Sequence, residues 1–400
     1  WLVPGVTARM SRPRFLTAMA VSAAVCEGLE DLIAKDGVTP AYLVFEWLLV
    51  EAFARSAARE DVLRTPGIDK ARSARESQIP MSATVYLKTP TVFGFHGVYR
   101  RLAVATDIVD ADVRLGENGY RLLKIWEREQ GLDCFVEGKS GYGLRGVIRA
   151  AVEAGLAEGY VNRSAAWKGW LFFTHNHIPS MTGKNESEFL RGLMVDERGE
   201  TRGELFRLLG KQRGARGADD TDEAAIARTL IGAASRELAT RLRAIFAFER
   251  FGVAIETAFD LLRYLSSQNK TKPLAARVYT SDSTVVKIAA RVPELLAKAA
   301  RSLALAPQKV ALEFGQVESA FVAVKTANEL YTALLERHAL VQKEKLPEGK
   351  REWFERAADE GVLVRTLYRL DMRPELHDVW NRPYRLQALR SFRHDLEEAR

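Results

Sequence analysis

Cysteine is scarce in this chain. Of 400 residues only two, Cys26 and Cys134, are cysteines, and neither belongs to a C-x-x-C motif. So few cysteines exclude a disulfide-stapled scaffold and favour a reducing, cytoplasmic compartment.

Long apolar runs are lacking as well. No stretch approaches the roughly 20 consecutive apolar residues that cross a bilayer, so we expect no membrane association. The run from Phe15 to Cys26 follows three arginines, as the apolar part of a signal peptide would, but its apolar spacing continues through Leu29, Leu32 and Ile33. We therefore interpret the run as a helix.

Charge of one sign is only slightly in excess. The chain has 59 Lys and Arg against 52 Asp and Glu, a net charge of +7, which excludes a general polyanion-coating role and directs attention to local basic patches. Apolar residues make up 47% and charged residues 28%, the composition of an ordinary globular protein. A chain of this length is sufficient for two or three domains.

Helical periodicity accounts for most of the chain. Thr39-Pro40 and Pro307 suit helix starts. The apolar spacing predicts long helices over residues 222–250, 251–267, 283–305 and 307–345. Strand-like sequence is concentrated near the middle of the N-terminal half. The sequence thus predicts a mainly α fold with a small α+β winged-helix-like subdomain and a C-terminal helical bundle.

Composition divides the chain into four regions. A Gly-rich, charged stretch at 210–221 has the character of a linker. The predicted regions are an N-terminal helical region with a basic loop, the mixed subdomain, a connecting region that ends in the linker, and the helical bundle; they cover residues 1–90, 91–163, 164–221 and 222–400.

The mixed subdomain has an informative order of elements. A helix is predicted at 94–106, a short strand with two polar turns at 107–119, and a helix at 120–129. The pattern L-x-x-x-G-x-x-L-L is formed by Leu115, Gly119, Leu122 and Leu123. In this order and pattern, residues 91–131 resemble the wing region of bacterial winged-helix regulators. The resemblance implies that the helix at 94–106 enters the major groove of DNA.

The basic residues of the chain gather around this segment. Between residues 64 and 101 seven Lys or Arg face two acids, so most of the net charge lies here, interleaved with aromatic residues that suit groove packing. We therefore predict a nucleic-acid interface. Its candidate residues, with two from the glycine-rich stretch that follows, are Arg64, Lys70, Arg72, Arg75, Lys88, His96, Tyr99, Arg100, Arg101, Lys139 and Arg145.

The stretch 133–146 contains three overlapping short motifs. A P-loop is incomplete, because Asp133 stands where its first glycine is needed. Gly141, Gly143 and Gly146 spell a dinucleotide fingerprint, but no acid follows at the distance that would hold the ribose. Both of these interpretations are set aside.

The third motif is the E-x-K of Glu137-Gly138-Lys139. It resembles that of the PD-(D/E)-x-K nucleases, in which two carboxylates hold Mg²⁺ and the lysine stabilises developing charge. Asp110, Asp112 or Asp133 could supply the first acid, although Asp133 precedes Glu137 by only four residues, closer than in that family. A nuclease that uses Asp133, Glu137 and Lys139 with Mg²⁺ is the alternative function. The simpler interpretation is a glycine-rich connection between a strand and a helix.

The sequence favours a non-enzymatic, cytoplasmic DNA-binding protein that holds no metal and no other cofactor. The helical region is expected to mediate self-association or to dock a protein partner, as in a subunit of a bacterial DNA-processing or phage-defence assembly. A structural scaffold that binds only proteins is a further alternative.

Two other patterns lead to negative expectations. His175 and His177 lie two apart on a predicted strand, but no further ligand completes a metal set. Within 222–345, cations are adjacent to acids, as in Glu249-Arg250, so we expect no stripe of one sign and no direct contact with DNA there.

Overall fold

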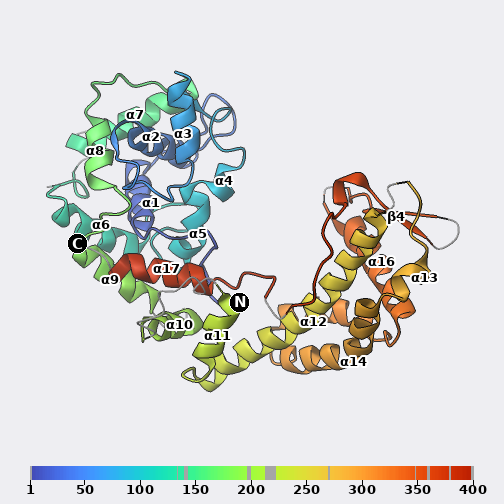
Figure 1. Cartoon of the computed structure of the whole chain (residues 1–400). Coiled ribbons are helices and arrows are strands. Elements are labelled where there is room, and N and C mark those ends of the chain that lie inside the picture. The colour runs from blue at the N-terminus through green and yellow to red at the C-terminus, as the bar shows by residue number, and fades with distance from the viewer. Residues whose placement is uncertain are drawn as a thin grey trace. The chain divides into compact units, whose positions relative to one another are not determined.

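The computed structural model describes residues 2–132, 134–138, 143–195, 200–211, 222–268, 271–346, 348–357, 361–377 and 380–397. They are mainly helical, which confirms the predicted fold class at this level. The chain forms two compact units, one of Trp1–Gly217 with Tyr384–Arg400 and one of Ala218–Pro383 (Figure 1). Within the described segments, we find no helix with the length and apolar character that crossing a membrane requires.

Two enclosed helices form the centre of the first unit. Every residue of α1 (Arg14–Val25) is buried, and so is most of α2 (Ala41–Ser56). Both sequences are apolar on nearly all sides, as expected of helices that other elements surround. α2 packs against α3 (Ile68–Glu76), α7 (Gly143–Glu158) and α8 (Gly169–Asn176). The helix begins one residue later than predicted, because Pro40 is the N-cap residue and not the first helical residue.

Three further helices lie together in the same unit. They are α9 (Lys184–Met194), α10 (Glu200–Lys211) and α17 (Leu386–Glu397), and α17 packs on both of the others. These contacts group the last residues of the chain with the first unit, whereas the sequence division places them in the region 222–400.

Strands are few. In the described part of the first unit, β1 (Met81–Ser82) pairs with β2 (Tyr160–Val161) antiparallel, with Met81 opposite Val161. The strand predicted before the glycine-rich stretch is wrong over residues 134–138, which form turns. The strand predicted at His175 and His177 is also wrong. There α8 buries Trp170 and Phe173 at a helical spacing of three.

The segment 91–131 contains both predicted helices but little of the predicted strand. After the short α4 (Pro90–Phe93), α5 (Phe95–Ala105) and α6 (Glu117–Glu129) match the predicted ranges to within a few residues. Between α5 and α6 the predicted strand is reduced to a single bridge of Val109 with Leu115.

A tight turn at Asp110 limits the predicted strand. Its carboxylate accepts the backbone N–H groups of Asp112 and Arg114, both at 2.8 Å, and so closes the loop as a tight turn in place of an extended arm. The winged-helix subdomain is therefore not confirmed.

A buried ionic cluster connects three helices of the first unit. The Arg14 guanidinium of α1 pairs with the Glu186 carboxylate of α9 and donates to the carbonyl of Asn176 in α8 at 2.8 Å. Thr17 donates to the same carboxylate. Burial raises the pKa of Glu186, and the Arg14 charge opposes that rise. Arg14 and Glu186 are at most 1% exposed, so each charge depends on its partner.

The second unit is organised around one long helix. α12 (Arg236–Ser267) packs along α14 (Ser283–Leu303), and α11 (Glu223–Ile231) precedes it. The predicted boundary at residue 250 is wrong, because α12 continues through it. The break instead precedes Ser235, whose hydroxyl accepts the Leu238 N–H at 3.2 Å as an N-cap.

The predicted helix 307–345 is divided. It forms α15 (Gln308–Phe321) and α16 (Ala327–Glu344), because Thr326 and Glu329 make a capping box that starts a new helix. Together with α13 (Ala276–Thr280), these helices give the region its predicted helical-bundle character. A hairpin of β3 (Phe354–Arg356) and β4 (Val362–Val364) follows, and then the short 3-10 helix Thr366–Tyr368.

We expect the first unit to lose stability in acid through His177. Its ring packs among Trp126, Phe172 and Phe173, and burial, followed by the Arg14 charge, lowers its pKa from 6.5 to about 3. The unfolded chain binds the proton below about pH 6.5, so this stabilisation is present above that pH and is lost as the pH falls toward 3.

The measurement is chemical denaturation at two pH values. His177→Phe should reduce the loss of unfolding free energy between about pH 7 and pH 4 by up to about 3 kcal/mol. His175→Phe is the matched control, because His175 is exposed and lies two residues away. An equal acid response in the wild type and His177→Phe would contradict the assignment.

Candidate anion-binding pocket

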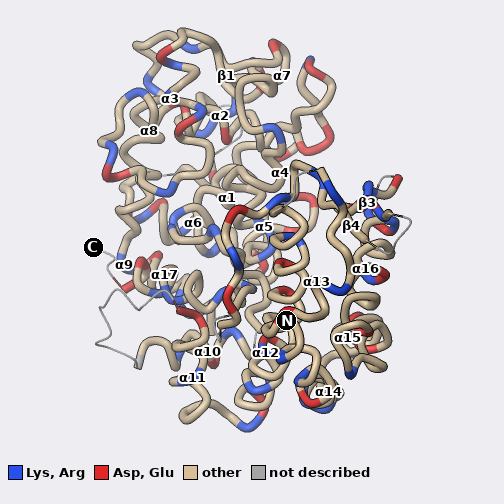
Figure 2. Tube along the Cα trace, turned by 45° about the vertical axis from the view of Figure 1, so that its right-hand side comes forward, with Lys and Arg blue, Asp and Glu red and all other residues tan. Residues whose placement is uncertain are grey.

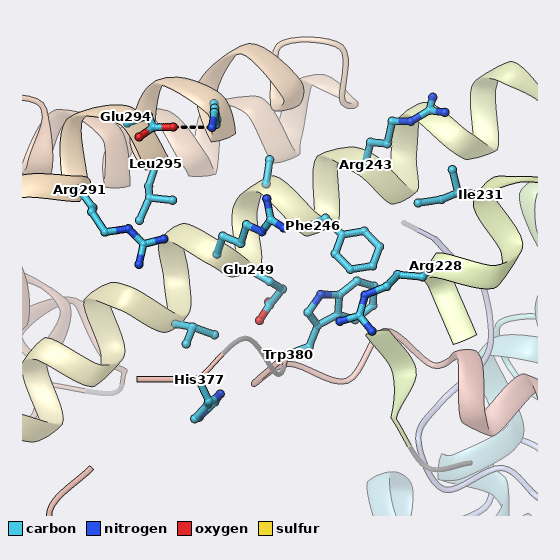
Figure 3. A pocket seen from close by; sticks show the side chains of 14 residues that line it. Arg228, Ile231, Arg243, Phe246, Glu249, Arg291, Glu294, Leu295, His377 and Trp380 are labelled. Carbon is cyan, nitrogen blue, oxygen red and sulfur yellow. Dashed lines mark hydrogen bonds and ion pairs between the residues drawn. The ribbon is translucent and has the colours of Figure 1, made fainter. Parts of the chain in front are cut away.

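A pocket of about 630 Å³ lies within the second unit. Its walls come from α11, α12 and α14 and from His377 and Trp380, which lie in irregular structure near the end of the unit. Figure 3 shows Arg291 reaching in from α14, and Arg228 beside the rings of Phe246 and Trp380.

Five cationic side chains and two acids line this pocket. The cations are all exposed, and they are Arg228, Arg243, Arg250, Arg291 and Lys298.

Both acids form ion pairs: Glu249 with Arg382, which lies outside the pocket lining, and Glu294 with Lys298 of the pocket. Glu249 is buried and pairs with Arg382 at 3.2 Å, while its other oxygen accepts the Asn381 N–H at 3.0 Å. Glu294 pairs with Lys298 at 2.5 Å, and this hydrogen bond lowers the pKa of the Glu294 carboxyl. In the described part of the chain no acid lies within ion-pair distance of the four pocket arginines, so the pocket carries a net positive charge.

The cations continue beyond the pocket along both helices. Residues seven apart lie within about 20° of one another around a helix. Arg236, Arg243 and Arg250 therefore share one face of α12, and all three are exposed. We call this row and the exposed cations of α14 the basic ridge; the α14 members are Lys287, Arg291, Lys298 and Arg301. The exposed Glu294 lies on the same face of α14, and Figure 2 marks the basic and acidic positions along the trace.

The basic ridge overturns one expectation from the sequence. A row of one sign does develop on one face of α12, although cations and acids are adjacent in the sequence, whereas on α14 the exposed Glu294 lies among the cations. Adjacent residues project about 100° apart on a helix, so Arg250 faces solvent while Glu249 is buried. Glu237 is neutralised in the same way, by pairing with Arg241 one turn later.

One side of the pocket is aromatic. The rings of Phe246 and Trp380 meet edge to face with centroids 4.7 Å apart, and the Arg228 guanidinium lies 5.7 Å from the Phe246 ring centre. Arg243 extends away from these rings (Figure 3). Guanidinium groups are suited to phosphate oxygens, and an aromatic wall is suited to a base or a sugar face. The arrangement can therefore bind an anion that carries a flat or apolar group.

Three of the residues predicted for the nucleic-acid interface are buried in the first unit. His96 contacts the Glu46 carboxylate at 2.8 Å, and the Tyr99 hydroxyl accepts the backbone N–H groups of Ser11 and Arg12. Arg145 donates to the carbonyls of Ala24 and Val136. These three predictions are wrong as surface contacts, because the polar groups are used to satisfy the interior of the fold.

Other predicted residues do reach the surface. Arg64, Lys70, Arg75, Lys88 and Arg101 are exposed, whereas Arg72 and Arg100 are half-buried. Arg100 donates to the carbonyl of Ala111.

The structure brings Arg72 and Arg75 together in another pocket of the first unit, of about 680 Å³. Arg55 and Arg163 join them there, but Arg55 pairs with Glu51 at 2.7 Å. Arg163 donates to helix carbonyls, and Arg72 lies 3.7 Å from Asp69. The cations of this pocket are thus more fully engaged than those of the second unit.

The residues of the nuclease alternative are only partly described. Asp133 and Lys139 lie outside the described residues. The Glu137 carboxylate is exposed and pairs with Lys124 at 2.8 Å, and this contact lowers its pKa. Lys124 also reaches Glu127 at 3.2 Å. In the described segments no three His, Cys, Asp or Glu residues are grouped so that they could hold a metal ion.

Comparison with known proteins adds no relative. No family model, no curated protein and no solved structure matches this chain.

The basic ridge was missed by the sequence reasoning, although a signal for it exists. The spacing of seven between Arg236, Arg243 and Arg250 is legible in the sequence, as is the spacing of seven between Arg291 and Lys298. The spacing of four between Glu294 and Lys298 can also be read from the sequence. The pairing of Glu249 cannot, because its partner Arg382 is more than 100 positions away in the sequence.

We expect inorganic pyrophosphate to stabilise the protein through this pocket. A multivalent anion that binds the folded state raises the melting temperature, by about 2–4 °C when its concentration is about ten times its dissociation constant. The measurement is a thermal shift with pyrophosphate against sodium chloride of equal ionic strength.

Two variants make that measurement specific. Arg243→Gln with Arg291→Gln should abolish the difference between the two salts. Lys309→Gln with Lys325→Gln removes the same charge from exposed positions outside the pocket and should leave the difference intact. An unchanged pyrophosphate effect in the arginine variant would exclude this pocket as the anion site.

Proposed function

We propose that this protein binds DNA without catalysing a reaction on it, and that the basic ridge of α12 and α14 makes the main contact. The observation that carries the proposal is the set of four pocket arginines without an acidic partner in the described residues, beside an aromatic wall. Neutralisation of phosphates by such side chains supplies most of the affinity in non-specific DNA binding.

The length of the ridge favours a polymer over a small anion. Arg236 and Arg250 are 14 residues apart, which spans roughly 21 Å at a rise of 1.5 Å per residue. This distance corresponds to about six base steps of B-form DNA at 3.4 Å each. A mononucleotide would contact only part of such a row, whereas one strand of DNA could follow it.

The winged-helix interpretation of residues 91–131 belongs to the same proposal as a second contact surface. It is supported by Arg101, which is exposed on α5, and by the half-buried Arg100 beside it. The remaining predicted reader residues on α5, His96 and Tyr99, face the interior. We therefore assign the main contact to the ridge and a lesser contact to α5.

A cytoplasmic protein that associates with partners in a bacterial DNA-processing or phage-defence assembly fits a DNA-binding role. The nuclease alternative receives less support, because Lys124 already occupies the carboxylate of Glu137. Incubation of the DNA with protein and Mg²⁺ reports directly on that alternative, and we expect no cleavage.

The decisive measurement is the affinity for duplex DNA across a series of salt concentrations. Arg243→Ala with Arg250→Ala should reduce the slope of log affinity against log salt by about 2, because about 0.9 is lost with each phosphate contact. Arg100→Ala with Arg101→Ala should reduce it by at most about 1, since Arg100 is held by Ala111.

The control and the contrary outcomes are equally specific. Lys309→Ala with Lys325→Ala changes the net charge by the same amount and should leave the slope within error. A larger loss in the α5 variant than in the ridge variant would move the main contact to the first unit. Equal affinities of all variants would exclude DNA binding by either surface, and tighter binding to an RNA duplex would redefine the ligand.

A further inference from the structure

The second unit contains a further cavity of different character, which the proposed DNA contact does not use. It has a volume of about 440 Å³ and lies between α12, α15 and α16. This volume falls within the range of about 300–1,000 Å³ that is usual for small-molecule sites.

The walls of this cavity are almost wholly apolar. Phe251, Phe321 and Leu334 are buried at its base, and the rings of Phe251 and Phe321 meet edge to face at 5.9 Å. Phe248 and Phe259 are half-buried and line the same space. Aromatic and aliphatic walls of this kind gain free energy when a ligand covers their apolar area.

Three groups that carry or could carry positive charge also line the cavity, and two of them are already bonded to other parts of the protein. Arg382 pairs with Glu249 and Glu256 and lies 5.0 Å from the centre of the Phe248 ring. The Nε2 atom of His338 accepts the backbone N–H of Trp353 at 3.0 Å. Burial, followed by the charges of nearby cations, lowers the pKa of His338 to about 4, so its ring is neutral at neutral pH.

The third group is the guanidinium of Arg337, which is available to a ligand. Its side chain is half-buried on α16, and among the described residues it has no hydrogen bond and no ion pair. A guanidinium can bind a carboxylate through two parallel, charge-assisted hydrogen bonds. Glu256, the acid that also lines the cavity, is engaged by Arg382 and by the side chain of Asn381 at 2.6 Å.

We infer that this cavity binds an amphipathic monocarboxylate, whose apolar chain covers the phenylalanine rings and whose carboxylate pairs with Arg337. The single available guanidinium matches one carboxylate, and the walls match a hydrocarbon chain.

The volume separates this ligand from an amphipathic helix of a partner. One turn of a helix with its side chains fills roughly 400–600 Å³, given a pitch of about 5.4 Å and a diameter of about 10–12 Å. Recognition of a helix in a groove uses anchors at i, i+4 and i+7, which span about two turns. A cavity of about 440 Å³ holds one turn at most.

The test compares decanoate with decanol, its uncharged counterpart, by calorimetric titration of the full-length protein below the micelle concentration of either ligand. We expect saturable binding of one decanoate per chain, about tenfold tighter than decanol, because only the carboxylate can form the charge-assisted pair. Arg337→Gln should weaken decanoate about tenfold and leave decanol unchanged.

Further variants test the location of the site. Ile255→Trp, or Val341→Trp if the first does not fold, places a large ring at the half-buried wall and should abolish binding of both ligands. Arg277→Gln is the matched control, since Arg277 is an exposed arginine of the same unit outside the cavity, and it should bind as the wild type does.

Several outcomes would overturn the inference. They are no binding of decanoate, equal affinities for decanoate and decanol, or an Arg337→Gln variant that binds decanoate normally. A concentration-dependent dimer that Ile255→Trp dissociates would replace the small ligand by a second copy of the chain. None of these results bears on DNA affinity, so failure here leaves the proposed function to its own test.

Discussion

The ion pair of Arg14 and Glu186 is the interaction on which the first unit depends. It is nearly inaccessible to water, and it joins α1 to α9 while a second nitrogen of Arg14 binds the end of α8 through Asn176. Desolvating two charges costs several kcal/mol for each ion, and hydrogen bonds to the other polar atoms of the pair offset part of that cost, although the buried Nε of Arg14 has no such bond among the described residues. Thr17 and the Gly183 N–H provide two of those bonds to the carboxylate, so the positions of three helices are fixed together.

Other buried arginines of the first unit also hold elements together by hydrogen bonds. A count of basic residues in the sequence therefore does not show how many of them reach the surface. Arg145 is buried, and it bonds the end of α1 at Ala24 to the turn at Val136. Arg202 is buried at the end of α9 and donates to the carbonyls of Leu193 and Met194. A guanidinium offers five donors in a fixed plane, which suits unpaired carbonyls at helix ends as well as it suits phosphates. An arginine-rich sequence therefore predicts either an interior scaffold or a nucleic-acid surface.

Most of the helical fold could be predicted from the sequence, because one physical signal determines it. The apolar spacing over 283–305 predicts α14 to within two residues, and Pro307 predicts the start of α15 to within one, although not its end. The strands predicted around His175 and Glu137 failed because short apolar runs do not distinguish a strand from a buried helix or turn. The break between α15 and α16 depends on the capping box at Thr326, whose hydrogen bonds compete locally with continuation of the helix.

The candidate site was harder to predict than the fold, because the net charge of a surface depends on which acids and cations form ion pairs in the folded protein. Glu249 directly precedes Arg250, so the sequence suggests that their opposite charges leave no net charge at this position. In the folded unit the helix turns Glu249 inward to Arg382, which the chain supplies from beyond the β3–β4 hairpin, and leaves Arg250 in water. The same long-range pair uses the guanidinium of Arg382, so that Arg337 is the arginine left open in the neighbouring apolar cavity. One tertiary ion pair thus influences the charge of both the anion-binding pocket and the apolar cavity, and sequence proximity carries no information about it.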